Sequence, residues 1–326
     1  MDRSKSDART PNACTIEAPC KINLHLAVKE KRPDGFHELE SLFACLALSD
    51  TLSFRVIKDK PETTRLSVDW ELPPHECPVN AIPSEKNLVL RAVSLFRERT
   101  GFAEGLDIKL CKRIPLGAGL GGASSDAAAS LLALNILAGT DLSPEELVDM
   151  AASLGSDVPF FIRCGAAYVG GRGELIEPLE VPLGLWVLLV KPPFFSDTAS
   201  AYSLLDKARE NASEALVPAA NLSKSVMIKA LKQDPSAWRY QNDFLSVLSP
   251  GGGGVNAEKT LSYTGILRGL AGSGAAFAGL SGSGSCCFGI FSLQKKAEKA
   301  EKEFSAQGIF TKLTFFLAHK PDPVVE

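Results

Sequence analysis

The sequence predicts an α+β fold divided into two domains. Segments with the alternating pattern of strands are mixed with helical segments, without the regular alternation that a doubly wound parallel sheet requires. The chain has 326 residues, of which 45% are hydrophobic and 22% charged, so it is long and apolar enough for two ordinary cores. We expect an N-terminal domain over residues 14–180 and a C-terminal domain over residues 181–326.

Composition narrows the class of protein further. The net charge of -3 does not favour nucleic acid or an anionic membrane, and no apolar run approaches the roughly 20 residues of a membrane helix. The first 14 residues are polar, which predicts a disordered leader and not a secretory signal. The 8 cysteines contain no C-x-x-C pair and the 4 histidines are scattered. We therefore expect reduced thiols, no zinc site and a cytoplasmic location.

The N-terminal half predicts strands, a tight turn and a helix. Residues 15–28 indicate a strand pair, or one bent strand broken at Pro19, with Lys21 and Asn23 on the same face. Residues 31–35 have the composition of a turn. A helix is expected to begin at Ser84 and to end at Gly101. Further strands are expected over residues 50–57, 65–68 and 106–110.

The rest of the chain predicts alternating helices and short strands. A helix follows the glycine-rich run at residues 117–122 and ends near Ala138, and Ser143-Pro144-Glu145-Glu146 begins another that ends at Gly155. Residues 251–254 form a glycine-rich insert that we expect to be a flexible surface loop. Strands are expected over residues 166–169, 185–190, 286–291 and 312–317, and helices over 199–209, 223–231, from 242 onward and over 293–304.

The glycine-rich run at residues 115–125 predicts an anion-binding loop. Its glycines at positions 117, 119, 121 and 122 allow a ligand to approach the main chain closely, and a helix follows at once. Ser124 or Ser125 is expected to cap that helix, whose first N–H groups are unpaired and whose dipole is positive. Loop and helix start together form a phosphate site.

Three other types of glycine-rich phosphate loop fit this run less well. Gly117-x-Gly119-x-x-Gly122 satisfies the dinucleotide fingerprint, but the preceding strand is interrupted by charged residues and by Pro115. A P-loop needs a lysine before the serine, and this chain has none there. Protein kinases need H-R-D and D-F-G motifs, which do not occur.

The residues at 115–129, PLGAGLGGASSDAAA, resemble the central motif of the GHMP small-molecule kinases, such as galactokinase, homoserine kinase and mevalonate kinase. Other segments resemble one branch of that family, whose acceptor is a cytidine-diphosphate-linked methylerythritol of the non-mevalonate isoprenoid route. These segments are residues 18–24, 34–39, 87–89, 155–161, 171–174, 242–245 and 280–284.

The resemblance implies a two-domain GHMP kinase fold, with an N-terminal domain like the ribosomal S5 domain 2 and a ferredoxin-like C-terminal domain. It implies ATP-dependent phosphorylation of the 2-hydroxyl of the cytidyl acceptor, with Mg²⁺ whose ligands the sequence does not identify. Another kinase of the superfamily and a dinucleotide-binding oxidoreductase remain the alternatives. We expect a small-molecule substrate, no nucleic acid or membrane partner, and a monomer or homodimer.

The resemblance also assigns roles to residues. Asp157 would accept the proton of the acceptor hydroxyl, and Lys21 would lie beside it and contact the hydroxyl or the γ-phosphate. Phe36 stands where the family often has tyrosine, which keeps a stacking face but loses a hydroxyl. ATP would be bound by Asn87, Pro115, Leu116, Gly117, Ala118, Gly119, Leu120, Gly121, Gly122, Ala123, Ser124 and Ser125. The acceptor would be bound by Asn23, Phe36, His37, Thr198, Tyr202, Ser281 and Gly282.

Overall fold

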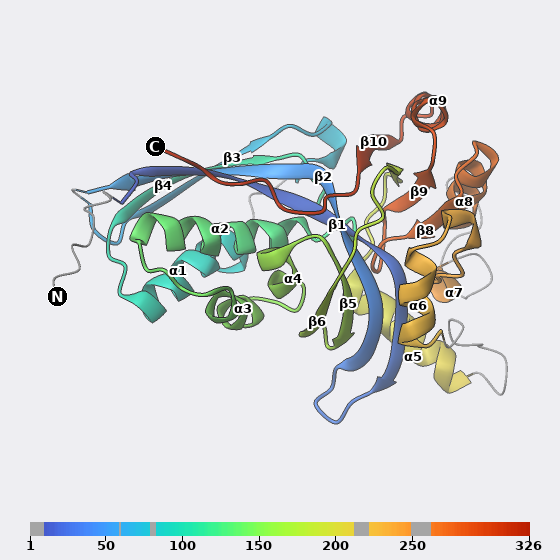
Figure 1. Ribbon diagram of the computed structural model, residues 1–326, viewed down its shortest axis with the longest axis horizontal. Helices are drawn as coiled ribbons and strands as arrows, with labels where there is room; N and C mark the ends of the chain where they lie inside the picture. Colours follow the sequence, from blue (N-terminus) through green and yellow to red (C-terminus); the bar gives the residue numbers. More distant parts are fainter. Residues whose placement is uncertain (1–9, 59, 79–82, 212–221, 249–261) are drawn as a thin grey trace.

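A computed structural model describes residues 10–58, 60–78, 83–211, 222–248 and 262–326, and the predicted insert at residues 251–254 lies outside them. The described chain contains two β-sheets (Figure 1). The larger sheet has 7 strands in the order β11-β1-β2-β4-β3, with β5 pairing on β2 and β6 pairing on β5. Its strands are β1 Ala13–Lys31, β2 His37–Ile57, β3 Thr64–Trp70, β4 Gly105–Lys112, β5 Ala166–Gly171, β6 Leu175–Leu179 and β11 Val324–Val325.

One face of the larger sheet is covered by helices from the first half of the chain (Figure 1). A core cluster of buried residues joins them, including Phe54 on the sheet and Phe96 and Leu134 on the helices. The helices are α1 Leu88–Thr100, α2 Gly122–Ala138, α3 Pro144–Ala152 and α4 Val158–Arg163.

The second sheet has 4 strands in the order β10-β7-β9-β8, all antiparallel. The strands are β7 Trp186–Lys191, β8 Phe277–Leu280, β9 Cys287–Phe291 and β10 Phe310–Phe315. The helices of this half are α5 Thr198–Asn211, α6 Lys224–Leu231, α7 Phe244–Leu248, α8 Tyr263–Gly272 and α9 Gln294–Ser305. After β10 the chain returns to the first sheet, where β11 pairs with β1 (Figure 1).

β1 and β2 form a long hairpin that reaches from the first sheet into the second half of the molecule (Figure 1). Their pairing register shifts between Pro19 and Lys21, so the predicted alternatives resolve to one bent strand. A lone bridge joins Leu26 of β1 to Asn242, and another joins Leu46 of β2 to Phe316. The hairpin is therefore shared by both halves of the fold.

Several local predictions are confirmed. Gly101 ends α1 with φ 74°, and α2 ends at Ala138. Ser143 and Glu146 form a capping box at α3. The strand at residues 105–112 and the helices near residues 199–209, 223–231 and 293–304 are also present, with shifted ends.

Other local predictions are wrong. The helix expected from Ser84 begins at Leu88, because Asn87 accepts hydrogen bonds from the N–H groups of Val89 and Leu90 and the preceding turn is only 3₁₀. The helix that begins at Pro144, α3, was expected to end at Gly155 but ends at Ala152. Residues 158–163 form α4, where no helix was expected, and α8 and β8 were also missed.

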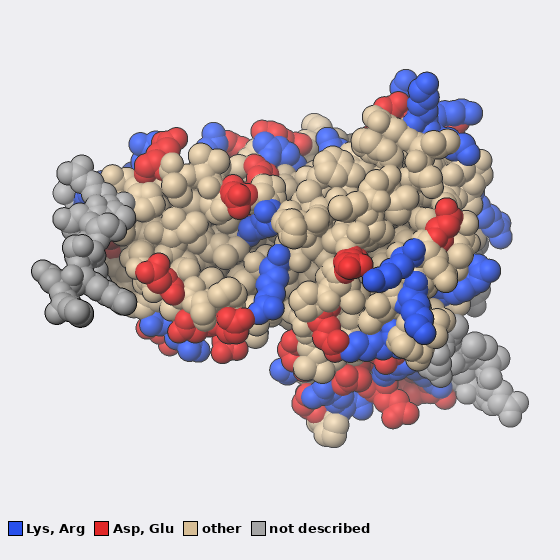
Figure 2. Space-filling model, viewed as in Figure 1, with Lys and Arg blue, Asp and Glu red and all other residues tan. Residues whose placement is uncertain are grey.

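Charged side chains of both signs are interspersed on the face drawn in Figure 2. Within the described ranges, no helix is long and apolar enough to cross a membrane.

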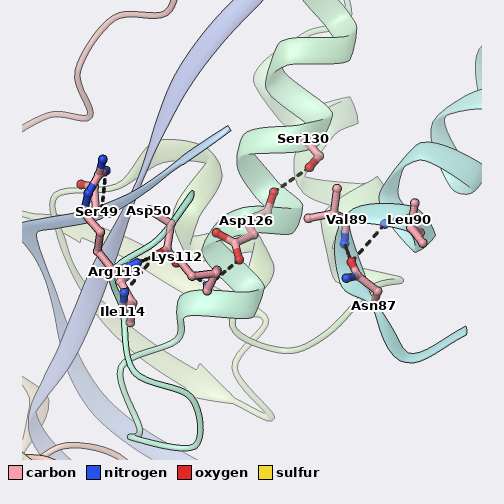
Figure 3. A network of polar contacts seen from close by, with 10 residues as sticks. All are labelled: Ser49, Asp50, Asn87, Val89, Leu90, Lys112, Arg113, Ile114, Asp126 and Ser130. Carbon is pink, nitrogen blue, oxygen red and sulfur yellow. Dashed lines mark hydrogen bonds and ion pairs between the residues drawn. The ribbon is translucent and has the colours of Figure 1, made fainter. Parts of the chain in front are cut away.

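The end of β4 is anchored by a buried charge network. Lys112 is 3% exposed and pairs with Asp50 of β2 and with Asp126 of α2, whose carboxylate oxygen lies 2.7 Å from its Nζ (Figure 3). Asp50 also accepts hydrogen bonds from the backbone N–H groups of Arg113 and Ile114, at 2.5 and 2.9 Å. The network therefore fixes the strand end that leads into the glycine-rich run.

We expect Lys112→Met to lower the free energy of unfolding by about 3–5 kcal/mol, because two buried carboxylates lose their shared cation. Lys109→Met is the matched control: Lys109 lies three residues earlier on β4 and pairs with Asp69 while 65% exposed. Such an exposed pair contributes little to stability, because water screens it. Urea unfolding of both variants measures the difference, and equal losses would contradict a structural role for Lys112.

Candidate functional site

The glycine-rich run forms a loop that enters α2 without a side-chain cap. Gly121 is the N-cap residue, with φ 71°, so the expectation that Ser124 or Ser125 caps the helix is wrong. Both serines lie inside the first turn, and Ser125 is 1% exposed. Because no capping side chain is present, the first N–H groups of α2 remain available to an anion.

Glycine is required in this loop by close approach of other segments. A Cβ on Gly119, which has φ 73°, would lie 2.1 Å from the carbonyl oxygen of Ser281. A Cβ on Gly121 would lie 2.8 Å from the ring of Phe161 and 3.2 Å from Cγ of Lys21. The loop is thus enclosed by β1, by α4 and by the loop at residues 281–284.

Lys21 and Asp157, far apart in sequence, lie side by side. Lys21 Nζ is 3.5 Å from Asp157 Oδ2, and their side chains are 4% and 35% exposed. Asp157 occupies the N-cap position of α4 but makes no capping hydrogen bond, so its carboxylate remains directed at Lys21 and solvent. Lys21 also lies 4.7 Å from the ring centroid of Phe43. A half-exposed carboxylate beside a buried ammonium group is suited to accept a proton from a bound hydroxyl.

Asn23 holds Lys21 in place. Its Oδ1 accepts a hydrogen bond from Lys21 Nζ at 2.6 Å, and its Nδ2 donates to Ser41 Oγ at 3.0 Å. The Ser41 hydroxyl donates in turn to the carbonyl of His25. Ser41 was not predicted from the sequence. Both ends of the Asn23 amide are therefore used within the protein.

A pocket opens beside the starts of α1 and α2. Asn87 lines it but also caps α1 through its Oδ1, so only its Nδ2 is left to a ligand. Lys112 and Asp126 form part of the wall (Figure 3). Burial and the neighbouring Asp50 raise the pKa of Asp126 to about 7, against the opposing effect of Lys112. Other lining residues are Leu116 and Ala123 of the glycine-rich segment and the apolar Val68, Trp70 and Leu110.

The two predicted aromatic residues of the β1–β2 turn have different environments. Phe36 is 53% exposed, and the Arg172 guanidinium lies 5.0 Å from its ring centroid. His37 is buried and stacks on Tyr202, with 5.1 Å between ring centroids and 24° between ring planes. Its Nε2 lies 2.7 Å from Asp206, a residue that the sequence reasoning missed. The spacing of Tyr202 and Asp206, four residues apart on one helix face, was the available signal.

The remaining residues that were predicted to bind the substrate lie in the loop of residues 281–284 or contact it. Ser281 Oγ donates to the carbonyl of Gly119 at 2.9 Å, and Thr198 Oγ1 lies 2.8 Å from Ser283 Oγ. Gly282 has φ 56° and its carbonyl accepts from Asn242 Nδ2 at 2.8 Å. Asn242 also bonds the carbonyl of Leu280, so this residue shapes the loop although no role was assigned to it.

Fold and phosphate loop together define a small-molecule kinase of the GHMP type. Residues 87–165 match the GHMP kinases N terminal domain and residues 228–309 match the GHMP kinases C terminal family. A solved 4-(cytidine 5'-diphospho)-2C-methyl-D-erythritol kinase superposes with a TM-score of 0.70 at 29% identity, covering 93% of this chain and 98% of that one. The mevalonate kinase of L. major, at 15% identity and TM-score 0.72, shares the fold, covering 94% of this chain and 97% of that one.

Sequence relatives are more specific. The 4-diphosphocytidyl-2-C-methyl-D-erythritol kinase of Thermodesulfovibrio yellowstonii is 36% identical over 89% of this chain and 94% of its own length. That of Chlorobaculum tepidum is 36% identical over 90% of this chain and 94% of its own. The chloroplastic kinase of Oryza sativa is 40% identical over 67% of this chain, and the match spans 51% of that protein.

The chain therefore belongs to the family of 4-diphosphocytidyl-2-C-methyl-D-erythritol kinases. The predicted GHMP kinase fold and the predicted kinase activity of the non-mevalonate isoprenoid route are confirmed at the level of this family. The dinucleotide-binding alternative is not supported by these matches.

We expect Gly119→Ala to destabilise the protein strongly and to abolish ATP binding, because the added methyl group overlaps the Ser281 carbonyl oxygen. Gly101→Ala is the matched control, since Gly101 has φ 74° but no atom within 4 Å of an added Cβ. That control should show only the left-handed strain of about 1–2 kcal/mol. Thermal unfolding and ATP titration check both variants. Similar behaviour of the two would contradict the packing argument.

Proposed function

We propose that the chain transfers the γ-phosphoryl group of ATP to the 2-hydroxyl of 4-diphosphocytidyl-2-C-methyl-D-erythritol, the acceptor in the names of its relatives. One observation carries the proposal at the level of this chain. The Lys21–Asp157 pair lies directly against the glycine-rich loop, with Lys21 Cγ 3.2 Å from where a Gly121 Cβ would be. The phosphate donor would therefore lie next to the group that accepts the proton.

The donor side is assigned to residues 14–180. The loop of residues 115–125 and the uncapped start of α2 offer backbone N–H groups to the α- and β-phosphates. Asn87 borders the pocket into which the base would extend. In this arrangement the γ-phosphate would face Lys21, whose charge would offset the negative charge of the transferring group.

The acceptor side involves the β1–β2 turn and residues 181–326. Phe36 and Tyr202 offer ring faces for cytosine, and His37 offers a polar edge. In the present geometry one face of Tyr202 is taken by His37, so the base would stack on the other face of that ring. We assign the erythritol and diphosphate portions to the neighbourhood of Asn23, Thr198, Ser281 and Gly282, where the Asn23 N–H lies 3.3 Å from Ser281 Oγ and Thr198 Oγ1 lies 2.8 Å from Ser283 Oγ.

Asp157 would act as the general base. Its carboxylate would accept the hydroxyl proton while the hydroxyl oxygen attacks the γ-phosphorus, the bond from that phosphorus to the β,γ-bridging oxygen breaks and ADP leaves. Lys21 would keep the carboxylate oriented. Lys21 is itself fixed by Asn23 and by the face of Phe43, so the reacting groups are positioned before the acceptor enters.

Mg²⁺ neutralises phosphate charge in this reaction class and is carried largely by the phosphates and water. Among the residues that the structure describes, no group of three or more His, Cys, Asp or Glu is placed to hold a metal. Ser124, in the first turn of α2, would offer its hydroxyl to a nucleotide-borne ion that needs few protein ligands, whereas Ser125 is 1% exposed. We assign no oligomeric state beyond a monomer or homodimer.

We expect ATP- and Mg²⁺-dependent turnover of the cytidyl acceptor with a kcat/KM at least about 10²-fold above those for homoserine and mevalonate, because a site that hydrogen-bonds a nucleobase discriminates strongly against acceptors without one. Coupled detection of ADP release measures all three. Equal turnover of the three acceptors, or none of the cytidyl acceptor, would contradict the proposal.

We expect Asp157→Asn to lower kcat by about 10²–10⁴-fold while leaving ATP affinity unchanged, because the amide cannot accept the proton. Asp149→Asn, an exposed carboxylate on the neighbouring helix α3, is the matched control and should keep full activity. Steady-state kinetics and ATP titration distinguish the two. A loss of less than about tenfold would remove Asp157 from the role of base.

A further inference from the structure

His37 is held by two residues of one helix. Its Nε2 is 2.7 Å from Asp206 Oδ1, and its ring stacks on Tyr202 at 5.1 Å. The His37 side chain is 7% exposed and the Asp206 side chain 28% exposed. Because Tyr202 and Asp206 are four residues apart on α5, they lie on one helix face and fix the imidazole in both plane and direction.

The contact with Asp206 decides which ring nitrogen carries hydrogen. An ionised carboxylate only accepts hydrogen bonds, so Nε2 must be the protonated nitrogen. In the neutral imidazole the lone pair is then on Nδ1, which is the nitrogen left for a ligand. His37 therefore offers a hydrogen-bond acceptor in its neutral form.

The support around this pair is continuous with the reacting groups. Phe244 of α7 meets the Tyr202 ring edge to face at 5.0 Å, so the stack is backed from a third element. Burial, with a contribution from the charge of Asp157, raises the pKa of Tyr202 to about 12, which places this ring within electrostatic reach of the proposed base. Lys31 lies 3.7 Å from the second oxygen of Asp206 and is 58% exposed.

We propose that Asp206 is a positioning residue that fixes the Nε2–H tautomer of His37 and thereby makes the acceptor site select cytosine over uracil. Cytosine presents an exocyclic amino group, a donor that pairs with the Nδ1 lone pair. Uracil presents a carbonyl oxygen in the same position, so two acceptors would face each other. The inference rests on the proposed function, because it assumes that the nucleobase reaches His37.

The first test compares cytidyl and uridyl forms of the acceptor with Asp206→Asn. The amide can donate to Nε2 and so permit the opposite tautomer. We expect the ratio of kcat/KM for cytidyl over uridyl acceptor to fall by about tenfold or more, since the buried mismatch that penalises uracil is relieved when the other tautomer can form. The change should appear in the KM of the acceptor, while kcat with the cytidyl form and the KM of ATP stay within about twofold.

Glu210→Gln is the matched control. Glu210 is exposed, lies four residues further along α5 and borders the same surface pocket as Asp206, so the variant removes an equal charge without contacting His37. Its selectivity should equal that of the unchanged protein. Equal loss of selectivity in the two variants would show a general charge effect and overturn the proposal.

A double-variant cycle tests whether Asp206 acts through His37. In a His37→Gln background, Asp206→Asn should have no further effect on selectivity, and additive effects would contradict the proposal. Nitrogen-15 NMR of the imidazole in the unchanged protein is independent of variant folding and should show hydrogen on Nε2; hydrogen on Nδ1 alone would overturn the inference. If the unchanged protein does not use the cytidyl acceptor, the proposed function fails; if it does and the tautomer differs, only this inference fails.

Discussion

The arrangement of the molecule depends on how closely the glycine-rich loop of residues 115–125 and the loop of residues 281–284 approach each other at Gly119. The Ser281 carbonyl oxygen lies where any side chain at residue 119 would begin, 2.1 Å from the position of a Cβ. Backbone bonds then hold the phosphate loop on both sides: Lys21 N–H donates to Leu120, and Cys286 N–H donates to Ala118. The Ser281 hydroxyl adds a bond to the Gly119 carbonyl, so all of these contacts use carbonyl groups of the loop and leave N–H groups for phosphate. The same contact joins the two halves of the chain.

Two buried lysines near this loop differ in what their charges can do. Lys112 is enclosed between Asp50 and Asp126, so its charge is balanced by two carboxylates within the protein and holds strand ends in place. Lys21 is equally buried, but its carboxylate partner Asp157 is 35% exposed and its other partner, Asn23, is neutral. The field of Lys21 is therefore only partly compensated within the protein, and the excess faces the space where phosphate would be transferred. Burial alone does not separate the two lysines; the exposure of their partners does.

The sequence could predict what local chemistry determines. The capping box at Ser143, the left-handed Gly101 and the extent of α2 follow from short motifs, and the neighbourhood of Lys21 and Asp157 followed from family resemblance. The cap of α2 was mispredicted because serine propensity was outweighed by a left-handed Gly121 pressed against Phe161. Asp206 and Asn242 were missed for another reason: each acts on a segment more than 30 residues away, so only the tertiary structure reveals its partner.

The fold alone does not determine the acceptor, because a mevalonate kinase at 15% identity shares it. In this chain, hydrogen bonds join the end of β1, just before the β1–β2 turn, to the second half of the molecule. Arg209 of α5 donates to the carbonyls of Val28 and Lys29, and the Val28 N–H donates to Asp243. Val28, Lys29 and Arg209 line one pocket together with His37 and Asp206, so α5 contacts both the hairpin strand and the imidazole. With the site residues as proposed, a change of acceptor would require coordinated change in the turn and in α5, while the glycine-rich loop could stay as it is.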